Sequence, residues 1–392
     1  MRWSVLTVGL ILVGLFWWGV QNAYFHQDDL DWFLLANRPL GEVLVYPIGD
    51  HVNYLFRLLI NIEWNWFGFN FAPYLLVSVV MHGIVIWLIY LVARASSGRR
   101  DLAAIAAVLF SINTNWNETV LWISGQTISI TAIFVLLAML AIWNNKSQGL
   151  MLFLASWTSA LSLGLLGATV VVDKRLRWKA IVILMLVGLI YLFWGGDGTS
   201  LPSSVTWLSR VVVVAGLMVV NTVIGRLIIP FDQFELMRIG IVTALLLWGL
   251  WRWRSQLIAV WRDQWSRLLV VQIFFYNMVV AVGRAQFGIG IMRAERYSYI
   301  GLALLLLLAV RIFRKVKFGK WIWVVPVIVI LQIIGFDVRA RAYIVRPQQL
   351  KILVRQLRQM RDEEIVMDAY LPKFVLNDDR LKYRDLLSLI KD

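Results

Sequence analysis

The chain has no cysteine among its 392 residues, which excludes disulfides, thiolate metal ligands and cysteine nucleophiles and leaves the compartment open. Charged residues are scarce, at 16% against about a quarter in an average soluble domain. Hydrophobic residues make up 60% of the chain, more apolar surface than a water-soluble core is able to bury. The scarcity of charge favours an integral membrane protein, and the 21 tryptophans fit a boundary between lipid and water.

Lysine and arginine are nevertheless in excess, with 38 basic against 23 acidic residues and a net charge of +15. In a soluble protein this balance would point to nucleic acid, but no stretch combines basic and aromatic residues on a soluble module, so we predict no nucleic-acid partner. The basic residues cluster in short gaps between apolar runs, which is typical of cytoplasmic loops. The clusters are Arg94/Arg99/Arg100, Lys174/Arg175/Arg177/Lys179, Arg252/Arg254/Arg262/Arg267 and Arg311/Arg314/Lys315/Lys317/Lys320.

The apolar runs predict the membrane crossings, since a spanning helix needs about 17 to 25 mostly apolar residues. Shorter runs are expected to be short or tilted helices packed against their neighbours. We therefore predict an all-α polytopic membrane protein with about eleven transmembrane helices. The clear candidates are 3–20, 73–93, 120–143, 179–195, 237–251, 268–283, 297–313 and 321–336, and the shorter runs are 102–112, 150–160 and 162–172.

The basic clusters set the expected orientation. Placing them inside makes the N-terminus cytoplasmic and the first loop, 21–72, extracytoplasmic, with amphipathic helices in that loop. The first run is read as an uncleaved anchor, because no small-residue cleavage site follows it. Both ends of 150–172 then face the cytoplasm, which predicts a hairpin turning near 159–162, and 208–229 is expected to be an outer-leaflet or re-entrant helix.

The chain is predicted to divide at residue 336. Residues 1–336 form the membrane domain, and 337–392 form a small soluble segment outside the cytoplasm. Within that segment the pattern predicts a helix over 348–360 and a short strand over 365–367. The expected location is a multi-pass membrane protein of a bacterial inner or cell membrane, with its polar chemistry on the side opposite to the basic loops.

Two adjacent acids, Asp28 and Asp29, stand directly after the first apolar run. Neighbouring carboxylates at a low-dielectric surface repel each other, which raises the proton affinity of one and suits it to act as a general base. A solvated acidic loop that follows the orientation rules is the alternative. The loop also contains His51, which either contacts a ligand or is a surface residue.

Three arginines, Arg284, Arg293 and Arg296, lie at an outer membrane boundary, where the positive-inside rule does not place them. A guanidinium group that binds phosphate oxygens in bidentate fashion is one reason for such a position. Pairing with Glu295, or reaching toward lipid head groups, is the alternative. His82 lies inside a predicted span, where an interhelical hydrogen bond is the simplest role for it.

Five segments carry a resemblance to a known family. They are Asp28-Asp29, Phe56-Arg57-Leu58, Met81-His82, the run Asn113-Thr114-Asn115-Trp116-Asn117-Glu118-Thr119-Val120-Leu121-Trp122-Ile123-Ser124-Gly125-Gln126, and Arg293-Ala294-Glu295-Arg296-Tyr297-Ser298-Tyr299. In this order they resemble the polyprenyl-phosphate-sugar-dependent glycosyltransferases of the C superfamily, nearest the bacterial relatives of the transmembrane tetratricopeptide-repeat O-mannosyltransferases. The sequence lacks the proline after Arg57, has Gln126 where the family has arginine, has Ser162-Leu163-Gly164 where relatives often have a Lys-Glu pair, and lacks the repeats.

The resemblance implies transfer of one sugar, with inversion, from a polyprenyl-phosphate carrier to a glycan, lipid or protein acceptor outside the cytoplasm. It implies that Asp29 or Asp28 is the base, with Asp29 slightly favoured, and that Glu118 positions the acceptor. A carboxylate at a helix start is the alternative for Glu118. The arginines 284, 293 and 296 would hold the donor phosphate. The implied substrate-binding residues are His51, Arg57, Gln126, Glu295 and Tyr297.

No cofactor is predicted. Some members of the family use a divalent cation and others none, and His26, Asp28, Asp29 and His51 have no spacing typical of a metal site. Two other functions stay open: a transporter or flippase of lipid-linked saccharides, and a non-catalytic membrane protein of envelope assembly. A transporter usually carries charged or broken positions near mid-membrane and paired repeats, whereas this chain has its acids at the outer rim.

Overall fold

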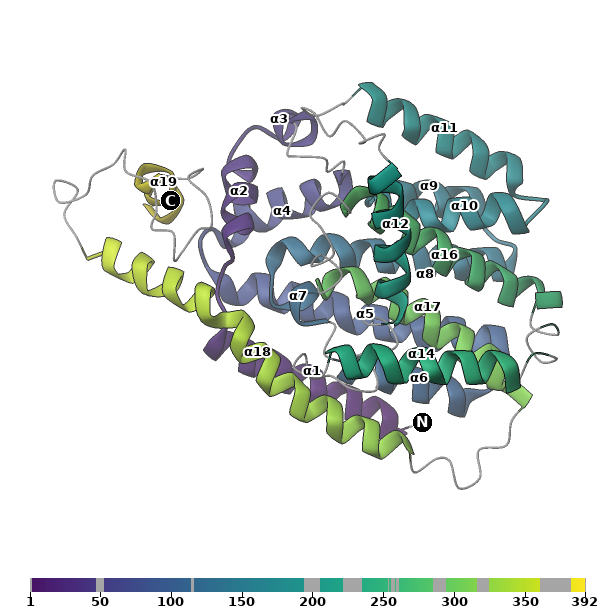
Figure 1. The fold of residues 1–392 in the computed structure, drawn as a ribbon. Coiled ribbons are helices and arrows are strands. Elements are labelled where there is room, and N and C mark those ends of the chain that lie inside the picture. Colours follow the sequence, from purple (N-terminus) through teal and green to yellow (C-terminus); the bar gives the residue numbers. More distant parts are fainter. Residues whose placement is uncertain are drawn as a thin grey trace.

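The computed structural model describes residues 2–46, 53–113, 116–193, 205–220, 235–252, 254, 258, 261–284, 294–315, 324–359 and 382–391. The described residues are helical and turn segments without a β-strand, so the predicted all-α class is confirmed (Figure 1). Four helical stretches are long and apolar enough to cross a membrane, which indicates a bilayer environment, while the figure of about eleven crossings stays a prediction. They are Phe71–Ser97, Ile123–Asn144, Gln264–Arg284 and Arg296–Lys315.

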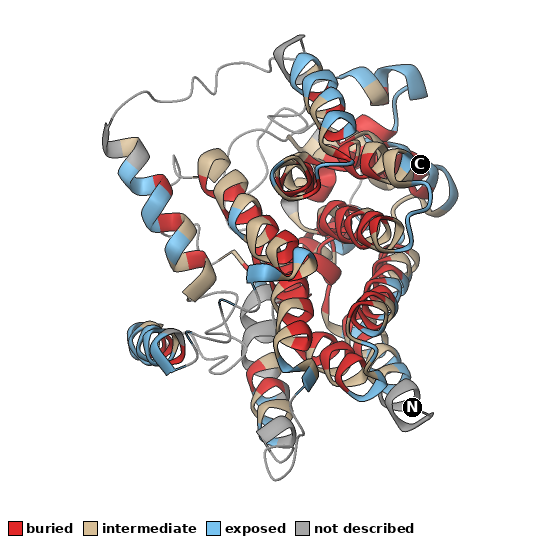
Figure 2. Ribbon diagram, turned by 90° about the vertical axis from the view of Figure 1, so that its right-hand side faces the viewer, coloured by how far each residue is buried: buried red, intermediate tan, exposed pale blue. Residues whose placement is uncertain are grey.

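Central helices form the core of the bundle. Helix α8 (Gln126–Asn144) packs against α5 (Phe71–Ser97), which also packs against α6 (Arg100–Ile112) and α17 (Arg296–Ile312). Of the apolar stretch that includes α8, 72% is buried inside the protein, compared with 44% for Gln264–Arg284. Figure 2 shows this difference as central helices buried along most of their length and outer helices with an exposed face.

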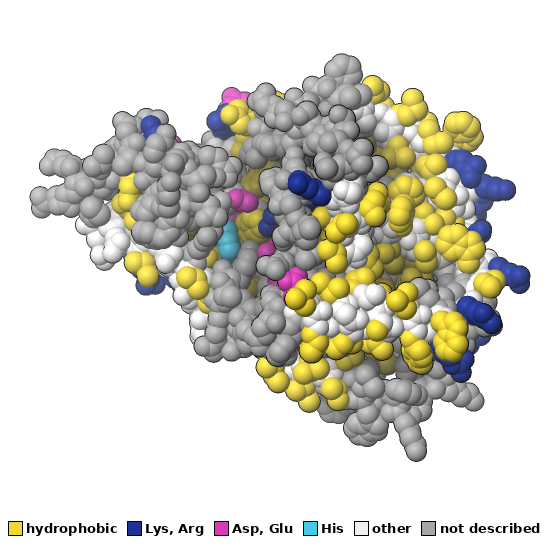
Figure 3. Space-filling view, in the orientation of Figure 1, with side chains coloured by type: hydrophobic (Ala, Val, Ile, Leu, Met, Phe, Trp, Pro, Cys, Tyr) yellow, Lys and Arg dark blue, Asp and Glu magenta, His cyan; other side chains and the backbone are white. Residues whose placement is uncertain are grey.

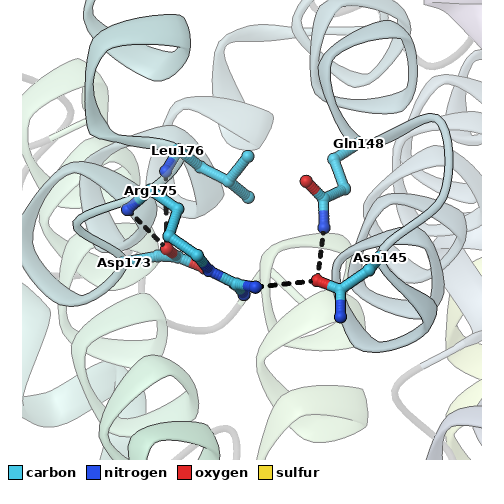
Figure 4. Close-up of polar contacts among 5 residues, drawn as sticks. All are labelled: Asn145, Gln148, Asp173, Arg175 and Leu176. Atoms are coloured by element: carbon cyan, nitrogen blue, oxygen red, sulfur yellow. Dashed lines mark hydrogen bonds and ion pairs between the residues drawn. The ribbon is translucent and has the colours of Figure 1, made fainter.

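A short hairpin packs beside this core. Helix α9 (Gln148–Ser156) is followed by η3 (Ala160–Ser162) and α10 (Leu163–Val172). Their outer ends meet, because Arg175 Nη1 donates a 3.0 Å hydrogen bond to Asn145 Oδ1 (Figure 4). The predicted hairpin with its turn near 159–162 is therefore confirmed. Helix α10 packs along α16 (Gln264–Arg284) and against α11 (Arg177–Phe193), and α16 contacts α12 (Val205–Leu217).

Helices of the bundle expose apolar stripes, as lipid-facing helices do. On α5 the exposed side chains recur at helical spacing on one face, and the opposite face is buried. The same pattern occurs on α14 (Glu235–Arg252). Such patches are rare on soluble monomers, so they support the bilayer assignment. The stripes are Leu76, Val80, Ile84 and Trp87 on α5, and Met237, Ile241, Leu245 and Trp248 on α14.

The first loop folds into three helices, α2 (Gln27–Ala36), α3 (Leu40–Val45) and α4 (Tyr54–Phe67), which pack against one another. This agrees with the expected helices in that loop. Arg57 holds α3 in place: the guanidinium group is buried and donates to the carbonyl oxygen atoms of Val43, at 3.0 Å, and Tyr46. These two hydrogen bonds are with the protein backbone, and the guanidinium carbon of Arg57 also lies 5.9 Å from the centroid of the Trp32 ring.

The predicted division at residue 336 falls inside a helix. Helix α18 (Val324–Leu357) continues through that position without a break and includes Pro347. It contacts the α1 (Arg2–Asn22) end through Gln348 Nε2, which donates to Asn22 O at 3.1 Å, and it also packs against α6. The predicted helix over 348–360 is thus the last part of a longer helix. Helix α19 (Tyr383–Lys391) returns to pack against α2, while residues 365–367 lie outside the described residues.

The two ends of the bundle differ in charge. Figure 3 shows lysine and arginine side chains at the right-hand end, and acidic and histidine side chains around a hollow toward the other end. Basic clusters from three loops meet at the right-hand end: Arg311 donates to Ser96 O and, at 2.5 Å, to Asp263, and Arg99 donates to Arg314 O at 3.2 Å. Helix α8 joins the two ends and is about 28 Å long, close to the roughly 30 Å of a bilayer's hydrocarbon core.

Candidate functional site

Asp29 is held at the first turn of α2 by three hydrogen bonds. The backbone N–H of His26 donates to Oδ2 at 2.8 Å. Ser124 donates twice to Oδ1, from its backbone N–H at 2.8 Å and from its hydroxyl at 2.7 Å. The side chain is completely buried. A carboxylate has about four acceptor positions, so one position on Oδ2 is left for a further donor.

Burial raises the pKa of Asp29 to about 7, and the neighbouring charge of Asp28 raises it further, while the hydrogen bonds from His26 and Ser124 oppose the shift. A low-dielectric site disfavours the charged carboxylate, which is the physical cause of the main effect. Asp28 is only half-buried. The two predicted acids therefore differ: Asp29 is fixed and has a proton affinity matched to neutral pH, and Asp28 lies closer to the surface.

Ser124 reaches Asp29 because two short elements pack unusually closely. Helix α7 (Asn117–Val120) and η2 (Ile123–Gly125) form a compact turn ahead of α8. A Cβ atom on Gly125 would lie 2.4 Å from the carbonyl oxygen of Glu118 and 2.8 Å from Cα of Thr119. Only glycine allows this approach, since neither contact is with a flexible side chain. The turn thus depends on the Gly125 position.

Glu118 and Arg296 form the second part of the site. Arg296 Nη1 lies 3.7 Å from Glu118 Oε2, and the backbone N–H of Arg296 donates to the same oxygen at 3.2 Å. The guanidinium group stands over the Trp122 ring, 4.4 Å from its centroid, and 5.1 Å from that of Tyr297. Arg284 also approaches the Tyr297 ring, at 5.6 Å. Two of the three predicted phosphate-binding arginines therefore gather around one tyrosine.

Trp122 connects the two parts. Its ring lies 4.4 Å from the guanidinium carbon of Arg296 and 5.6 Å from the His26 ring, and His26 is the residue whose N–H holds Asp29. Among the described residues, no hydrogen bond or ion pair joins Asp29 directly to an arginine. The predicted acid and arginine groups are therefore linked through contacts of His26 and Trp122, although their segments lie more than 250 positions apart in the sequence.

Gln126 lies below this surface and is fully buried. Its amide nitrogen donates to Glu63 Oε1 at 3.1 Å, to Ser78 Oγ at 3.1 Å and to the Tyr74 carbonyl oxygen at 3.3 Å. Burial raises the pKa of Glu63 to about 8, and the charge of Asp29 adds to the shift, while the Gln126 hydrogen bond opposes it. The amide nitrogen of Gln126 thus contacts protein groups, and its contact with substrate stays a prediction. Glu63 was not among the predicted site residues.

His82 and Tyr299 join two further segments of the resemblance. His82 Nδ1 and the Tyr299 hydroxyl are 2.7 Å apart, although the residues are separated by 217 positions. The His82 ring also lies 5.7 Å from the Trp116 ring. Both side chains of the hydrogen-bonded pair are buried, which confirms the expected interhelical role of His82. This pair fixes the start of α17 relative to α5 and therefore the position of Arg296.

Of the other predicted site residues, the structure describes Glu295 and Tyr297. Glu295 is buried, and its backbone carbonyl oxygen accepts hydrogen bonds from Ser298, so it caps the start of α17. The Tyr297 carbonyl oxygen accepts a 2.5 Å bond from the Tyr276 hydroxyl. His51 and Arg293 lie outside the described residues.

Several buried polar atoms near the site have no hydrogen-bond partner in the part of the chain that the structure describes. Such atoms usually meet water or a ligand, because an unpaired buried polar atom is costly. They come from α4, α7, the loop after α7 and the first turn of α8, which surround Asp29. They are Glu63 Oε2, both side-chain polar atoms of Asn117, Thr119 Oγ1, Trp122 Nε1 and Gln126 Oε1.

The opposite end of α8 has a different polar cluster (Figure 4). Asp173 is buried and accepts hydrogen bonds from the backbone N–H groups of Arg175, at 2.9 Å, and Leu176, at 3.4 Å. Gln148 and Arg175 both donate to Asn145 Oδ1. A cavity of about 160 Å³ adjoins this cluster. Here the polar groups satisfy one another and close the turns between helices.

No group of three or more His, Asp or Glu side chains able to hold a metal ion occurs within the described ranges. Comparison of the chain with protein-family models, curated proteins and solved structures gives no match.

Proposed function

We propose that the protein is a membrane glycosyltransferase that moves one sugar from a polyprenyl-phosphate carrier to an acceptor outside the cytoplasm. The observation that carries the proposal is the grouping around Trp122. Asp29 is a fixed carboxylate that accepts from the N–H of His26, whose ring lies 5.6 Å from the Trp122 ring, and the guanidinium group of Arg296 stands over the Trp122 ring. These are the two charges that such a transfer requires, a proton acceptor and a stabiliser of a phosphate leaving group.

The chemical step is a single displacement. The acceptor hydroxyl oxygen attacks the anomeric carbon of the sugar and loses its proton to Asp29 Oδ2. The bond between the anomeric carbon and the phosphate oxygen breaks, and its electron pair stays on that oxygen, which leaves as the polyprenyl phosphate. Attack from the face opposite to the leaving group inverts the anomeric configuration. No oxidant, reductant or co-reactant beyond donor and acceptor is needed for this balance.

Asp29 is preferred over Asp28 as the base for two reasons. Its pKa of about 7 is near the pH at which a general base is most effective. Ser124 and His26 also fix its orientation, so the remaining acceptor position on Oδ2 has a defined direction. In this proposal Asp28 acts through its charge, which helps to raise the proton affinity of Asp29.

Arg296 and Arg284 are the proposed phosphate ligands. Both guanidinium groups approach the Tyr297 ring, and arginine binds phosphate oxygen atoms in bidentate geometry. Glu118 orients Arg296 through the 3.7 Å ion pair and accepts from its backbone N–H. Because the carboxylate and guanidinium already pair, the arginine is oriented before the donor binds, which lowers the entropy lost on binding.

The site is proposed to face away from the cytoplasm. The basic loops lie at the end of α8 opposite to Asp29, and basic loops mark the cytoplasmic side. The acids also lie at the rim of the bundle, where transfer to an acceptor at the membrane surface would occur. A transporter would instead place its ionisable groups near mid-membrane, so the arrangement favours surface chemistry over transport.

The test is transfer of radiolabel from polyprenyl-phosphate sugars to candidate acceptors by the purified full-length protein. We expect Asp29→Asn to lower the rate by about 100-fold to 10,000-fold, the usual contribution of a general base. Asp28→Asn is expected to retain activity with a lower apparent pKa, because the charge near Asp29 is removed. Size-exclusion chromatography checks that the variant is folded. Full activity of folded Asp29→Asn would overturn the proposal.

A further inference from the structure

Two of the unpaired buried atoms near the site belong to the partners of a single contact. Gln126 Nε2 donates to Glu63 Oε1 at 3.1 Å, while Glu63 Oε2 and Gln126 Oε1 have no hydrogen-bond partner within the described residues. Glu63 is 2% exposed and Gln126 is fully buried, so bulk water does not reach either oxygen atom. Each unpaired buried oxygen is costly, and one change satisfies both at once.

The orientation of the Gln126 amide follows from its surroundings. The amide nitrogen faces three acceptors, which are Glu63 Oε1 and Ser78 Oγ, both at 3.1 Å, and the Tyr74 carbonyl oxygen at 3.3 Å. An amide nitrogen only donates and an amide oxygen only accepts, so the reversed amide would turn its oxygen toward acceptors. Oε1 of Gln126 therefore needs a donor.

A protonated Glu63 supplies that donor. A neutral carboxyl group has one O–H, so Glu63 Oε2 donates to Gln126 Oε1 while Glu63 Oε1 accepts from Gln126 Nε2. The two planar groups then meet along both edges in an eight-membered ring, and neither oxygen stays unpaired. An ionised Glu63 has no proton to donate, and it would set a charged oxygen against the amide oxygen in a buried site, which is unfavourable.

The ionisable groups around Glu63 also favour its neutral form. Asp29 on α2 adds negative charge, which together with burial raises the pKa of Glu63 to about 8. No described cation forms an ion pair with Glu63. Tyr74 on α5 donates its hydroxyl to a backbone carbonyl oxygen, α8 has no ionisable side chain, Glu42 on α3 is exposed, and Arg57 on α4 donates to carbonyl oxygen atoms of the α3 segment.

The contact of Glu63 with Gln126 is connected to the proposed base through a short turn. Gln126 is the first residue of α8, and its backbone N–H donates to carbonyl oxygen atoms of η2. Ser124 in η2, two residues earlier, donates to Asp29 Oδ1 from its N–H at 2.8 Å and from its hydroxyl at 2.7 Å. The start of α8 is therefore held by α4 through Glu63, and it holds Asp29 through Ser124.

We infer that Glu63 is a positioning residue, which in its protonated form closes the ring with Gln126 and so fixes Ser124 for its hydrogen bonds to Asp29. The positioning role rests on the proposed function, whereas the protonation of Glu63 is measured without turnover. Loss of the proton makes the two facing oxygen atoms repel each other, which displaces the start of α8 and moves Ser124 relative to the base. The site thus has an upper pH limit set by Glu63 and a lower one set by Asp29.

The first measurement is infrared spectroscopy of the purified full-length protein in the Asp29→Asn background, where residue 29 gives no carboxyl signal. The carbonyl band of a protonated carboxyl group should be present at pH 7 and disappear as the pH rises through about 8, or slightly below because the Asp29 charge is absent. Adding Glu63→Gln should remove this band. Adding Glu42→Gln, which neutralises an exposed glutamate of the same loop, should leave it.

The second measurement is the pH profile of sugar transfer. The wild-type kcat should fall roughly fivefold from pH 8 to pH 9, as the fraction of Glu63 that keeps its proton falls, with KM within about twofold because the ring acts on the base. Glu63→Gln keeps a donor and an acceptor, so its kcat should stay within about twofold over that range. Glu63→Met has neither and should lose about tenfold to 100-fold at every pH, while Glu42→Gln should follow wild type.

Several results would overturn the inference. Absence of the band at pH 7, or its survival in Glu63→Gln, would show that Glu63 is ionised. A wild-type kcat that does not fall above pH 8, or an equal fall in Glu63→Gln, would remove the upper pH limit from Glu63. Full activity of Glu63→Met would show that the contact does not fix the base. A wild type that transfers no sugar but shows the Glu63 band would overturn the proposed function and leave the protonated pair standing.

Discussion

The two ends of α8 contain similar residue types but differ in how their polar groups are satisfied. At the Asn145 end, Asp173 accepts from two backbone N–H groups and Arg175 pairs with both Asp173 and Asn145. At the Gln126 end, Asp29 and Glu63 are buried carboxyl groups with raised pKa values, and several neighbouring polar atoms have no partner within the described residues. A satisfied cluster stabilises a turn, whereas an unsatisfied one keeps capacity for a ligand.

The largest expected difference between the ends concerns their arginines. Arg296→Gln should lower sugar transfer by about 100-fold to 1000-fold, the usual cost of losing one group that stabilises developing charge. The matched change at the other end, Arg175→Gln, should leave the rate within twofold, because the Arg175 side chain is exposed and lies at the end of α8 away from Asp29. Initial rates at saturating donor measure both. Equal effects of the two substitutions would remove the distinction between the ends.

Substituting one glycine at each end of α8 tests whether close backbone packing matters for activity at both ends. In Gly125→Ala the new methyl group meets Glu118 and Thr119 backbone atoms, which must move and take Ser124 away from Asp29. We expect a loss of activity of about 100-fold, the scale for a 1 Å misplacement, and a stability cost of about 1 to 3 kcal/mol.

Gly149→Ala is the control at the other end, where the nearest atom is the flexible side chain of Lys179 at 3.7 Å. Its activity and melting temperature should match wild type. A Gly125→Ala protein that is also fully active would show that the close packing of α7 against η2 is not needed for catalysis.

The pH dependence of stability and the pH dependence of activity separate the structural role of Asp29 from its role as a base. The folded protein holds this proton up to a pKa of about 7, against 3.8 for an unperturbed aspartate, so the folded state binds more protons than the unfolded state between those pH values. Stability from this group is therefore lost as the pH rises from about 4 through about 7. Activity should change in the opposite direction and rise about tenfold per pH unit below pH 7.

Melting followed by tryptophan fluorescence and initial rates between pH 5 and pH 8 measure the two slopes. Asp29→Asn should flatten the stability slope. Glu63→Gln removes the second raised pKa, of about 8, so it should flatten part of the stability slope while the activity profile keeps its midpoint near pH 7. An activity midpoint below pH 5 in wild type would contradict the assignment of Asp29 as the base.

The smallest expected effect is at the Asp173 end. Asp173→Asn loses charge-assisted hydrogen bonds to Arg175 and Leu176, which should lower stability by about 1 to 3 kcal/mol. The activity of the folded fraction should remain that of wild type. Chemical denaturation in detergent, with activity normalised to folded protein, measures both. A large loss of specific activity would show that this end also acts on the site.

The order of motifs along the chain predicted more of the site than composition did. The segments of Asp29, His82, Glu118 and Arg296 all belong to the predicted family resemblance, and contacts of Ser124, Trp122 and Tyr299 link them in the structure. Gln126 was predicted to bind substrate, yet its amide faces the interior. A motif position gives no direction for a side chain, because direction depends on how α8 rotates against α5.

Glu63 was missed although the sequence contained a signal. It stands within the apolar stretch of α4, and an acid among apolar residues is seldom fully buried without a partner. Its partner, Gln126, is 63 positions away, a pairing that no local pattern reveals. The division at 336 stays a prediction: Asp337, Arg339 and Arg341 end the apolar run, and α18 continues through this position because charge ends a membrane span without ending a helix.

The length of α8 affects how Ser124 is oriented toward Asp29. Ser124 and Gln126 stand at one end of a helix whose other end is anchored by the Asn145 and Arg175 contact. Each residue adds 1.5 Å and about 100° of rotation. One extra residue within α8 would therefore turn the hydroxyl of Ser124 out of phase with Asp29, and roughly four extra residues, just over a full turn, would return it to nearly the same azimuth at greater height.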